Sequence, residues 1–475
     1  MDHPVCFLHP TIRTFAGPLR QALLIHRGRV VGFQPRAGCR QLRLPGAVVL
    51  PAFADAHLHL LPLIERVVGV DCRDIRSLSA LLDRLRNAPG EGWVRATGYD
   101  LGLVHPSREE LDRAVPHRPV RLLHRTGHLV VMNSLALRAI PPPLWEVGLA
   151  AGWVEQDSHG CPTGRLWEPA SWLAGRVLPP LSEAELRHGL AQLARDLFAW
   201  GVTTVHDASP TNDAARLALW QRLDPPFRLL FLPGEHFSDP EGAAHSSAPA
   251  RLRLGPTKLL LPDQPRELPS LAELCTRIRA VGRPVAIHAV VHQAVRLAVE
   301  AVAATRVSAR IEHAAEWPPD LTPLAQGAPL RVVVHPGWLR ERAGWYRDQV
   351  APELLPWLHR GRSFLRAGIP MLFGSDAPAG TLDPLAMLAG AVTRRGSDGT
   401  LLTPTERLTV GQALRALMAG RADLDPASRD GALRRGALAD FVVLDRDPFV
   451  TPPAELATIQ VLETYRAGER VWPPE

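Results

Sequence analysis

The 475-residue sequence has almost no lysine: Lys258 is the only one among its 54 lysine and arginine residues. Arginine fills every other position of this kind. The two side chains differ wherever a buried amine has to lose its proton or react, because a guanidinium group stays charged. The simplest explanation of a single lysine is that it remained by chance and has no special role. A position among other candidate site residues would instead favour a chemical role for Lys258.

Cysteine is also sparse, and its pattern excludes two kinds of small protein. The five cysteines are scattered, odd in number and never arranged as C-x-x-C: Cys6, Cys39, Cys72, Cys161 and Cys275. A disulfide framework or a zinc ribbon needs paired, regularly spaced cysteines. We therefore expect ordinary reduced thiols.

Long apolar runs and basic clusters are absent as well. No stretch approaches the roughly 20 uninterrupted apolar residues of a transmembrane helix, and Met1 to Pro4 do not lead from a basic into an apolar segment. We expect a cytoplasmic protein without a membrane segment. The net charge is +6, but the arginines form neither a run nor an aromatic-interleaved patch, so nucleic acid binding is not indicated.

The order of apolar segments predicts an α/β fold. Short β-rich runs alternate with helical patterns in the second half of the chain, which is typical of a parallel sheet, and the length suits a TIM-type (β/α)8 barrel with a satellite domain. The barrel strands are expected near Val48 to Ala56, Val202 to Asp207, Phe227 to Leu232, Thr257 to Leu261, Val285 to His288, Arg310 to His313, Arg331 to His335 and Pro370 to Ser375.

Two other regions are expected beside this barrel, which would span residues 48–430. The connection from His59 to Pro180 is far longer than the usual few residues, so about 60–180 should form an insertion subdomain over the barrel mouth. A hairpin is predicted inside it, between residues 152–155 and 164–167. The β-like chain ends, residues 1–47 and 431–475, should pair into a small β-sandwich domain.

Candidate metal ligands follow the predicted strands. His57 and His59 are two residues apart on an extended segment, so both can point to one side and bind one ion, although an isolated H-x-H is more often incidental. Barrel enzymes keep their chemistry at the carboxyl ends of the strands. The other residues at such ends are Lys258, His288, His313 and Asp376, and the combined set predicts a site for zinc or a related ion.

Several segments are family-specific in combination. They are Leu50 to His59, Gly127-His128 with Asn133 to Leu137, Pro162 to Glu168, Ile311 to His313, Gly374 to Pro378 and Gly436 to Asp440. Through these motifs the sequence resembles the amidohydrolase superfamily over nearly its whole length. The resemblance is to the amidohydrolase-3 branch, which includes N-substituted formamide deformylases.

This resemblance implies an activity and a division of the ligands. His57 and His59 would bind one metal ion and His288 and His313 another, with a carboxylated Lys258 bridging them and Asp376 completing the site. Two zinc ions are expected, with manganese or iron as alternatives. A metal-bound hydroxide would attack the carbonyl carbon of an amide or formamide, a carbon-nitrogen bond other than a peptide bond, and Asp376 would carry the proton.

The sequence departs from the family pattern at the fourth, fifth and seventh strands. Lys258 is followed by Leu-Leu-Leu-Pro rather than a segment ending in Asp-Gly, Val291-His292 replaces the usual Gly-Asp, and His335-Pro336 replaces Gln-Pro. The substrate therefore remains open. His335 could touch substrate or metal, or be structural.

Further residues are candidates for substrate contact: His128, Asn133, Glu168 and His335. Hydrogen bonding within the insertion explains His128 and Asn133 equally well. Most tryptophans serve packing, but several at a barrel mouth would favour a small-molecule substrate with an apolar or aromatic substituent. Those expected near the mouth are Trp153, Trp167, Trp172, Trp317, Trp338 and Trp345.

Three other functions remain to be weighed. A Schiff-base lyase would use Lys258 as a nucleophile but leaves the histidines unexplained. A mononuclear deaminase of the same superfamily shares the H-x-H pair and final aspartate but normally lacks the strand lysine. A noncatalytic relative would tend to lose ligands, whereas every ligand position is filled here. A homodimer is one option for the oligomeric state, which the sequence leaves open.

Overall fold

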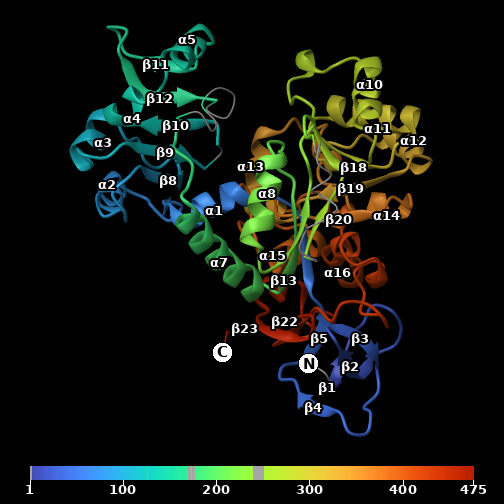
Figure 1. The fold of residues 1–475 in the computed structure, drawn as a ribbon. Helices are drawn as coiled ribbons and strands as arrows, with labels where there is room; N and C mark the ends of the chain where they lie inside the picture. Colours follow the sequence, from blue (N-terminus) through green and yellow to red (C-terminus); the bar gives the residue numbers. More distant parts are fainter. Residues whose placement is uncertain (1–2, 126, 169–172, 174–176, 239–250, 475) are drawn as a thin grey trace. The chain divides into compact units, whose positions relative to one another are not determined.

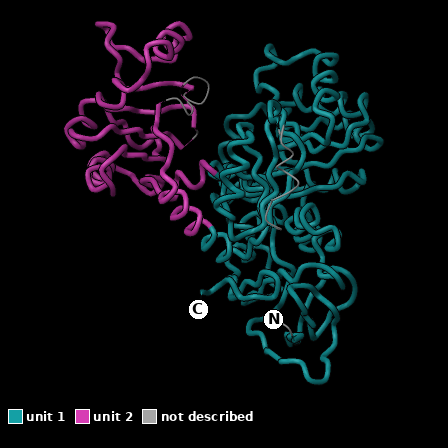
Figure 2. The backbone as a smooth tube through the Cα atoms, viewed as in Figure 1, with its two compact units in different colours: residues 1–60, 194–475 teal, residues 61–193 magenta. Residues whose placement is uncertain are grey.

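The structure is a computed structural model that describes residues 3–125, 127–168, 173, 177–238 and 251–474. The chain divides into two compact units, Met1–Leu60 with Ala194–Glu475 and Leu61–Leu193 (Figure 2). Across these described ranges, no helix combines the length and the apolar character that crossing a bilayer requires.

The first unit contains a TIM-barrel-type arrangement of two parallel sheets (Figure 1). Isolated bridges link the sheets, between Leu58 and Ala377 and between Gly234 and Lys258, but the strands of the described residues do not form one continuous hydrogen-bonded sheet. The first sheet contains β6 (Phe53–Leu58), β13 (Val202–Asp207), β14 (Arg228–Phe231) and β15 (Leu252–Leu254). The second contains β16 (Thr257–Leu260), β17 (Val285–Ala289), β18 (Ala309–His313), β19 (Leu330–Val334) and β20 (Met371–Phe373).

The predicted strands from Val202 onward each overlap an observed parallel strand, but the first prediction was wrong in extent. The stretch Val48 to Ala56 is two strands, because β5 (Val48–Pro51) pairs antiparallel with the carboxyl-terminal segment. Ala52 N still donates to Asp440 O, whereas Phe53 N donates to Gly201 O beside β13. The chain therefore leaves one sheet and enters the other within two residues.

Helices follow several of the parallel strands. A capping box begins α7 (Glu183–Ala199), with Ser182 N and Glu185 N each bonded to the other residue's side chain, and Gly201 follows with a left-handed φ of 76°. The later helices are α8 (Ala214–Leu223), α10 (Leu271–Val281), α11 (His292–Thr305), α12 (Thr322–Gln326), α13 (Gly337–Gln349), α14 (Arg362–Arg366), α15 (Pro384–Thr393) and α16 (Val410–Ala419).

The second unit is built on a six-stranded mixed sheet in the order β11-β12-β10-β9-β8-β7. The predicted hairpin is confirmed, because Val154 pairs with Leu166 across it. The strands are β7 (Val70–Asp71), β8 (Val94–Tyr99), β9 (Val120–His124), β10 (Leu129–Met132), β11 (Val154–Gln156) and β12 (Pro162–Trp167). The helices are α1 (Leu60–Val68), α2 (Leu78–Arg86), α3 (Arg108–Ala114), α4 (Ser134–Arg138) and α5 (Pro142–Ala150).

The chain ends pair with each other in one hydrogen-bonded sheet of eight strands, and the β-sandwich domain expected of them stays a prediction. Phe7, Phe441 and Tyr465 form its aromatic core, with the Phe441 and Tyr465 rings stacked at 4.4 Å. Besides β5, the strands are β1 (Val5–Ile12), β2 (Arg20–His26), β3 (Arg29–Gly32), β4 (Arg40–Arg43), β21 (Phe441–Leu444), β22 (Val461–Arg466) and β23 (Glu469–Trp472).

A buried carboxylate joins this terminal sheet to the parallel strands. Asp440 accepts hydrogen bonds from Arg228 Nε at 2.7 Å, from Arg228 Nη2 at 3.0 Å and from Ala467 N at 2.7 Å. Thr203 Oγ1 donates to it at 3.3 Å. Burial acts to raise the pKa of Asp440, but the Arg228 guanidinium outweighs burial and lowers it. The ion pair thus connects β13 and β14 with the hairpin of β22 and β23.

We predict that Asp440→Asn destabilises the protein. The substitution leaves the Arg228 guanidinium buried without its counter-charge, which typically costs about 3 kcal/mol of unfolding free energy. Denaturant unfolding measures the change. Asp320→Asn is the matched control, because Arg296 and Asp320 form an exposed pair whose loss should leave the free energy of unfolding nearly unchanged. Equal destabilisation by both variants would contradict this role of Asp440.

Candidate metal centre

The predicted ligands lie at the carboxyl ends of the parallel strands. His57 is on β6 and His59 follows it, while Lys258, His288 and His313 are on β16, β17 and β18. His335 follows β19 and Asp376 follows β20. Because the strands of both sheets are parallel, their carboxyl ends meet on one face, which is where barrel folds place their sites.

The structure brings most of these residues together. His57, His313 and His335 form one group and His57, His59 and Asp376 a second, with the candidate ligand atoms of each group within 4.8 Å of one another. The ring of His288 lies outside both groups, but its centroid is 4.4 Å from that of His313. The predicted set therefore converges, and His335 lies among the candidate metal ligands.

The hydrogen bonds of two histidines determine which ring nitrogen carries the proton. His57 Nδ1 lies 2.5 Å from the Glu312 carboxylate and His335 Nδ1 lies 2.8 Å from Gly374 O, so each Nδ1–H donates. His57 Nε2 and His335 Nε2 are left with lone pairs and, like His313 Nδ1, have no hydrogen-bond partner within the described parts of the chain. Buried polar atoms without partners are costly.

These unpartnered nitrogens fit a metal ion. Neutral imidazole nitrogens with a carboxylate are the ligands that zinc and related divalent ions bind in proteins. Burial lowers the pKa of His57 well below its usual value, and Lys258 lowers it further despite Glu312 and Asp376. Burial and the neighbouring His288 and His335 likewise lower the pKa of His313. The imidazoles of His57 and His313 are thus neutral and able to act as ligands.

Asp376 supplies the anionic member of the second group. Its Oδ1 lies within hydrogen-bond distance of His59 Nε2, at 3.2 Å, and 3.5 Å from His57 Nε2. Burial acts to raise the pKa of Asp376, but the hydrogen bond from His59 and the surrounding imidazoles lower it below its usual range. Asp376 is therefore ionised at neutral pH.

Lys258 is buried beside this group. Its side chain is 2% exposed, and Nζ has no hydrogen-bond partner among the residues that the structure describes. Burial lowers the pKa of Lys258 to about 8; Arg310 acts in the same direction, while Glu312 and Asp376 oppose it. The protonated form still dominates at pH 7, but the neutral fraction of the amine is far larger than in an ordinary exposed lysine, and a neutral amine is a nucleophile.

A buried network behind His57 was not predicted from the sequence. Glu312 accepts from His57 Nδ1 and also from Arg310 Nε, at 2.7 Å. Arg310 Nη2 donates to Ala56 O, and Nη1 lies 2.9 Å from His206 Nδ1. His206 Nε2 in turn donates to Gly420 O at 3.0 Å. These side chains form a continuous chain of hydrogen bonds that begins at Gly420 O and ends at the His57 ring.

The signal for this network was present on β18. Arg310 and Glu312 are two residues apart on a strand, so their side chains lie on the same face of the sheet. Charged side chains in a buried strand rarely lack a partner of opposite charge. The alternation should then place His313 on the opposite face. Its left-handed φ of 68° ends the regular strand at this residue. Asp376 has a φ of 56°, and such backbone strain tends to cluster at functional sites.

Asp55 ties β6 to the segment that carries Asp376. Its Oδ1 accepts from His57 N at 3.1 Å and from Ser375 N at 2.9 Å. Burial raises the pKa of Asp55 to about 6, although these hydrogen bonds oppose the shift. Gly374 is required beside it, because a Cβ at this position would lie 2.6 Å from the Cβ of His57.

Three of the predicted substrate contacts lie in the second unit. His128 Nδ1 and Glu168 Oε2 pair at 3.0 Å, and both side chains are exposed. Asn133 is fully buried: it caps α4 through Ala136 N, accepts from Val120 N and donates to the carbonyls of Val115 and Arg118. Its amide is thus occupied by hydrogen bonds within its own unit.

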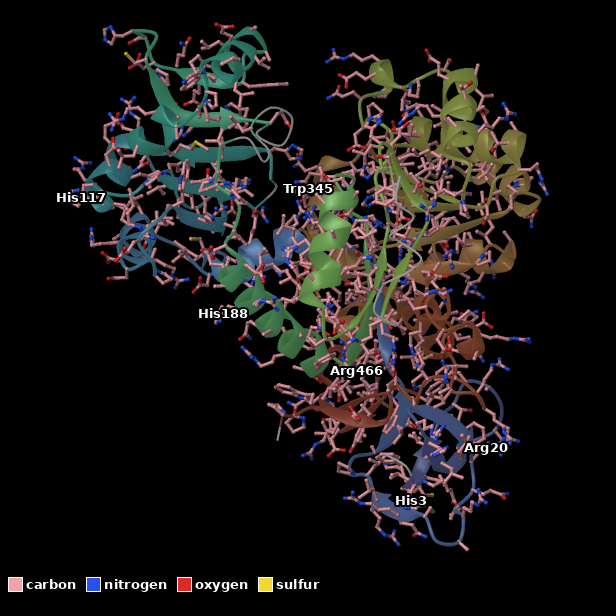
Figure 3. All side chains as sticks on the ribbon, in the orientation of Figure 1. His3, Arg20, His117, His188, Trp345 and Arg466 are labelled. Atoms are coloured by element: carbon pink, nitrogen blue, oxygen red, sulfur yellow. The ribbon has the colours of Figure 1, made fainter. Side chains whose placement is uncertain are left out.

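The tryptophans differ in surroundings. The ring centroids of Trp338 and His335 are 5.7 Å apart, so Trp338 lies beside the candidate metal ligands. The expectation for Trp317 was wrong, because it is fully buried against Phe364 in the core. Trp345, labelled in Figure 3, is 57% exposed. Trp153 and Trp167 belong to the second unit, and Trp172 lies outside the described residues.

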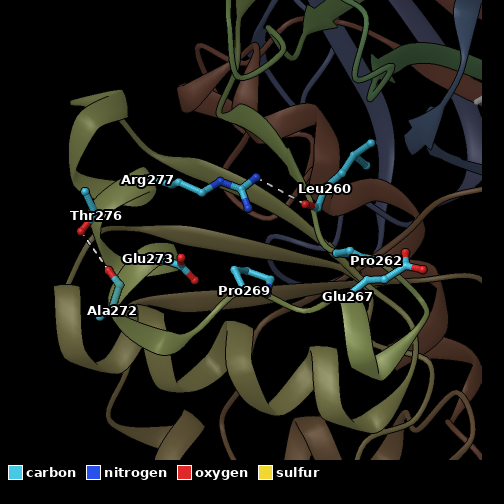
Figure 4. Close-up of a pocket in the computed structure, with 8 residues that line it drawn as sticks. All are labelled: Leu260, Pro262, Glu267, Pro269, Ala272, Glu273, Thr276 and Arg277. Atoms are coloured by element: carbon cyan, nitrogen blue, oxygen red, sulfur yellow. Dashed lines mark hydrogen bonds between the residues drawn. The ribbon is translucent and has the colours of Figure 1, made fainter.

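A hollow of about 770 Å³ lies between the segment after β16 and the first turns of α10 (Figure 4). Leu260, Pro262, Pro269 and Ala272 give it an apolar lining. Arg277 closes one side and donates to Leu260 O at 3.4 Å. None of the predicted metal ligands lines it, but Leu260 is the register partner of His288 on β17.

We predict that Glu312→Gln weakens metal binding. The neutral amide removes the charge that orients His57 with a protonated Nδ1, and loss of such an outer partner typically lowers metal affinity about 10- to 100-fold. Competition with a chromophoric chelator measures the affinity, and circular dichroism checks the fold. Glu316→Gln is the matched control, because Glu316 pairs with His292 away from the cluster. Unchanged affinity in folded Glu312→Gln would rule out the orienting role.

Comparison with solved structures agrees with the observed architecture. An uncharacterized metal-dependent hydrolase from Pyrococcus horikoshii OT3 superposes with a TM-score of 0.79 at 23% identity. The match covers 95% of this chain and 99% of that one. At this identity the likeness establishes the fold, which is TIM-barrel-type.

Comparison of sequences identifies the family. N-substituted formamide deformylase of Arthrobacter pascens is 28% identical over 529 residues, covering 94% of each chain. The putative amidohydrolase YtcJ of Bacillus subtilis (strain 168) is 26% identical over 477 residues, covering 91% of this chain and 90% of that protein. A family model described as the amidohydrolase family matches residues 44–472. The resemblance read from the motifs is confirmed: the chain belongs to the amidohydrolase family.

Proposed function

We propose that this amidohydrolase cleaves a carbon-nitrogen bond other than a peptide bond, in an amide or formamide, with two divalent ions of the zinc type. The convergence of neutral, unpartnered imidazole nitrogens with ionised Asp376 and buried Lys258 carries the proposal. The named activity of the Arthrobacter pascens relative, N-substituted formamide deformylase, supports the choice of bond.

The chain's own residues would divide between the two ions. His57, His59 and Asp376 form one ligand group, and the adjoining rings of His313 and His288 supply ligands to the other ion. Lys258 lies between them in this assignment. When bound, divalent ions lower the pKa of water toward about 7 and polarise a substrate carbonyl.

Lys258 fits the bridging position through its protonation state. Burial keeps part of its amine neutral, and a neutral amine adds to carbon dioxide. The new nitrogen-carbon bond forms as one nitrogen proton leaves to solvent, and the resulting carbamate has two oxygens that share one negative charge. Such a group offers one oxygen to each of two cations, which a guanidinium or an ammonium group cannot do.

Asp376 is the proposed proton carrier. It is ionised, and only one of its oxygens is engaged by His59, so the carboxylate can accept a proton from the attacking water. It then delivers the proton to the leaving nitrogen, which completes cleavage of the carbon-nitrogen bond. His59 Nδ1 lies 3.3 Å from Ser209 Oγ, and this contact orients the ring that faces Asp376.

The substrate class follows from the apolar surroundings. Leu260 is 45% exposed and shares register with His288, and the hollow that it lines is largely apolar. Trp338 provides a flat aromatic surface beside His335. A small amide with an apolar or aromatic substituent on nitrogen suits this environment.

The first test combines metal analysis with hydrolysis. Purified protein should contain about two divalent ions per chain and hydrolyse members of a panel of N-substituted formamides, and a strong chelator should abolish the activity until metal is restored. Mass spectrometry of the metals and assay of the released amine provide the two readouts. Metal-free protein that is also inactive after metal addition would refute the proposal.

The second test is the substitution Lys258→Arg. It preserves the positive charge but cannot form the carbamate, so the bridge between the ions is lost and hydrolysis should fall at least about 100-fold, the upper end of the loss that removal of an outer partner of a metal site causes. Arg296→Lys, an exposed exchange of the same two residue types, should leave the rate unchanged.

Lys258→Ala extends this test, since small carboxylates should partly restore its activity by filling the vacated bridging position. Full activity in Lys258→Arg would contradict the bridging role. Covalent trapping of substrate on Lys258 by borohydride would instead support a Schiff-base lyase.

A further inference from the structure

The geometry points to His335 as a metal ligand, partner of His313 on the second ion, so that imidazoles from three successive strand ends bind that ion. This inference rests on the proposed function, because it assumes a metal centre at this site. It adds a ligand to that centre and assigns it to one of the two ions.

The first argument is the fixed orientation of the ring. His335 Nδ1 donates to Gly374 O at 2.8 Å, which leaves Nε2 as the nitrogen with a free lone pair. The side chain is fully buried, and Nε2 has no hydrogen-bond partner in the part of the chain that the structure describes. A ring held this way presents an acceptor, not a donor, to the site.

The second argument is what surrounds that nitrogen. The His335 ring centroid lies 4.7 Å from His313 and 5.2 Å from His57, and its ligand nitrogen falls in one group with theirs. These neighbours also present ring nitrogens with no partner of their own among the described residues, and the bond from His57 Nδ1 to Glu312 leaves His57 Nε2 unprotonated. Several lone pairs directed at one small buried space repel each other unless a cation lies between them.

The third argument assigns the ion. His57 has only Nε2 to offer, because Glu312 holds its Nδ1–H, and so His57 can ligate one ion. His57 belongs to both three-residue groups, and these cannot both be complete at once. If His57 joins His59 and Asp376, the imidazoles left for the second ion are those of His335, His313 and His288. The ring centroids of His288 and His313 are 4.4 Å apart. Three imidazoles together with the proposed bridge from Lys258 make a four-ligand set that suits zinc.

The experiment measures metal binding by His335→Gln with the cobalt-loaded full-length protein. Loss of a direct ligand should lower the affinity for the more weakly held ion at least about 10-fold, which is the smallest loss expected when only an outer partner is removed. The visible absorption of bound cobalt should also change. Chelator competition and the cobalt spectrum are read without substrate. His292→Gln is the matched control, because His292 pairs with Glu316 away from the cluster.

A second variant guards against misfolding and against weak ligation by glutamine. His335→Ala should lose the same ion, and free imidazole should restore both its affinity and the cobalt spectrum by occupying the vacated space. Unchanged affinity and spectrum in His335→Gln, or no rescue of folded His335→Ala by imidazole, would overturn the inference.

These outcomes separate the inference from the proposed function. If both variants retain two ions with wild-type affinity and only KM rises, His335 contacts substrate; the hydrolase proposal then stands and the ligand inference falls. If the wild-type protein binds no metal and hydrolyses nothing, both fail together.

Discussion

The hydrogen bond between Glu312 and His57 is the interaction on which the rest of the site depends. A carboxylate buried this deeply is stable only when its charge is fully compensated, and Arg310 provides that compensation from the same strand. Glu312 can then accept the proton-bearing nitrogen of His57 and direct the other nitrogen into the cluster. Without the guanidinium the carboxylate would tend to be neutral, and the His57 ring would lose its defined orientation. The ion pair of Arg310 and Glu312 on β18 therefore determines which nitrogen of His57, on β6, is available to a metal ion.

The same site requires two parallel strand ends to approach each other unusually closely. β6 and the segment after β20 meet at the bridge between Leu58 and Ala377, where Asp376 N donates to His57 O, and Asp55 accepts from the backbone N–H groups of both His57 and Ser375. Gly374 makes this approach possible, and its carbonyl oxygen also orients His335. Backbone packing and ligand placement thus depend on the same few residues.

The sequence was sufficient for the parallel strands and for the convergence of His57, His59, His313 and Asp376, because residue alternation and strand ends follow simple geometric rules. It failed at β5, where the apolar run does not reveal that its hydrogen bonds belong to another sheet. It also missed Arg310 and Glu312, whose meaning depends on which distant imidazole meets the carboxylate. The strands β7 to β10 were missed because their pairings lie inside an insertion without a repeating pattern. The place of His335 in the cluster needed the hydrogen bond to Gly374, which no local pattern encodes.

The step from β5 to β6 within two residues couples two parts of the molecule thermodynamically. His57 lies on a strand whose other end continues directly into the sheet formed by the chain termini, and Asp440 locks that sheet to β13 and β14. A ligand that binds only the folded cluster stabilises everything that must be folded for the cluster to exist. Occupancy of the centre and integrity of the terminal sheet are therefore linked equilibria. Substitutions that destabilise the outermost strands of the terminal sheet would therefore weaken ion binding, and ion binding would reduce local unfolding at both chain ends.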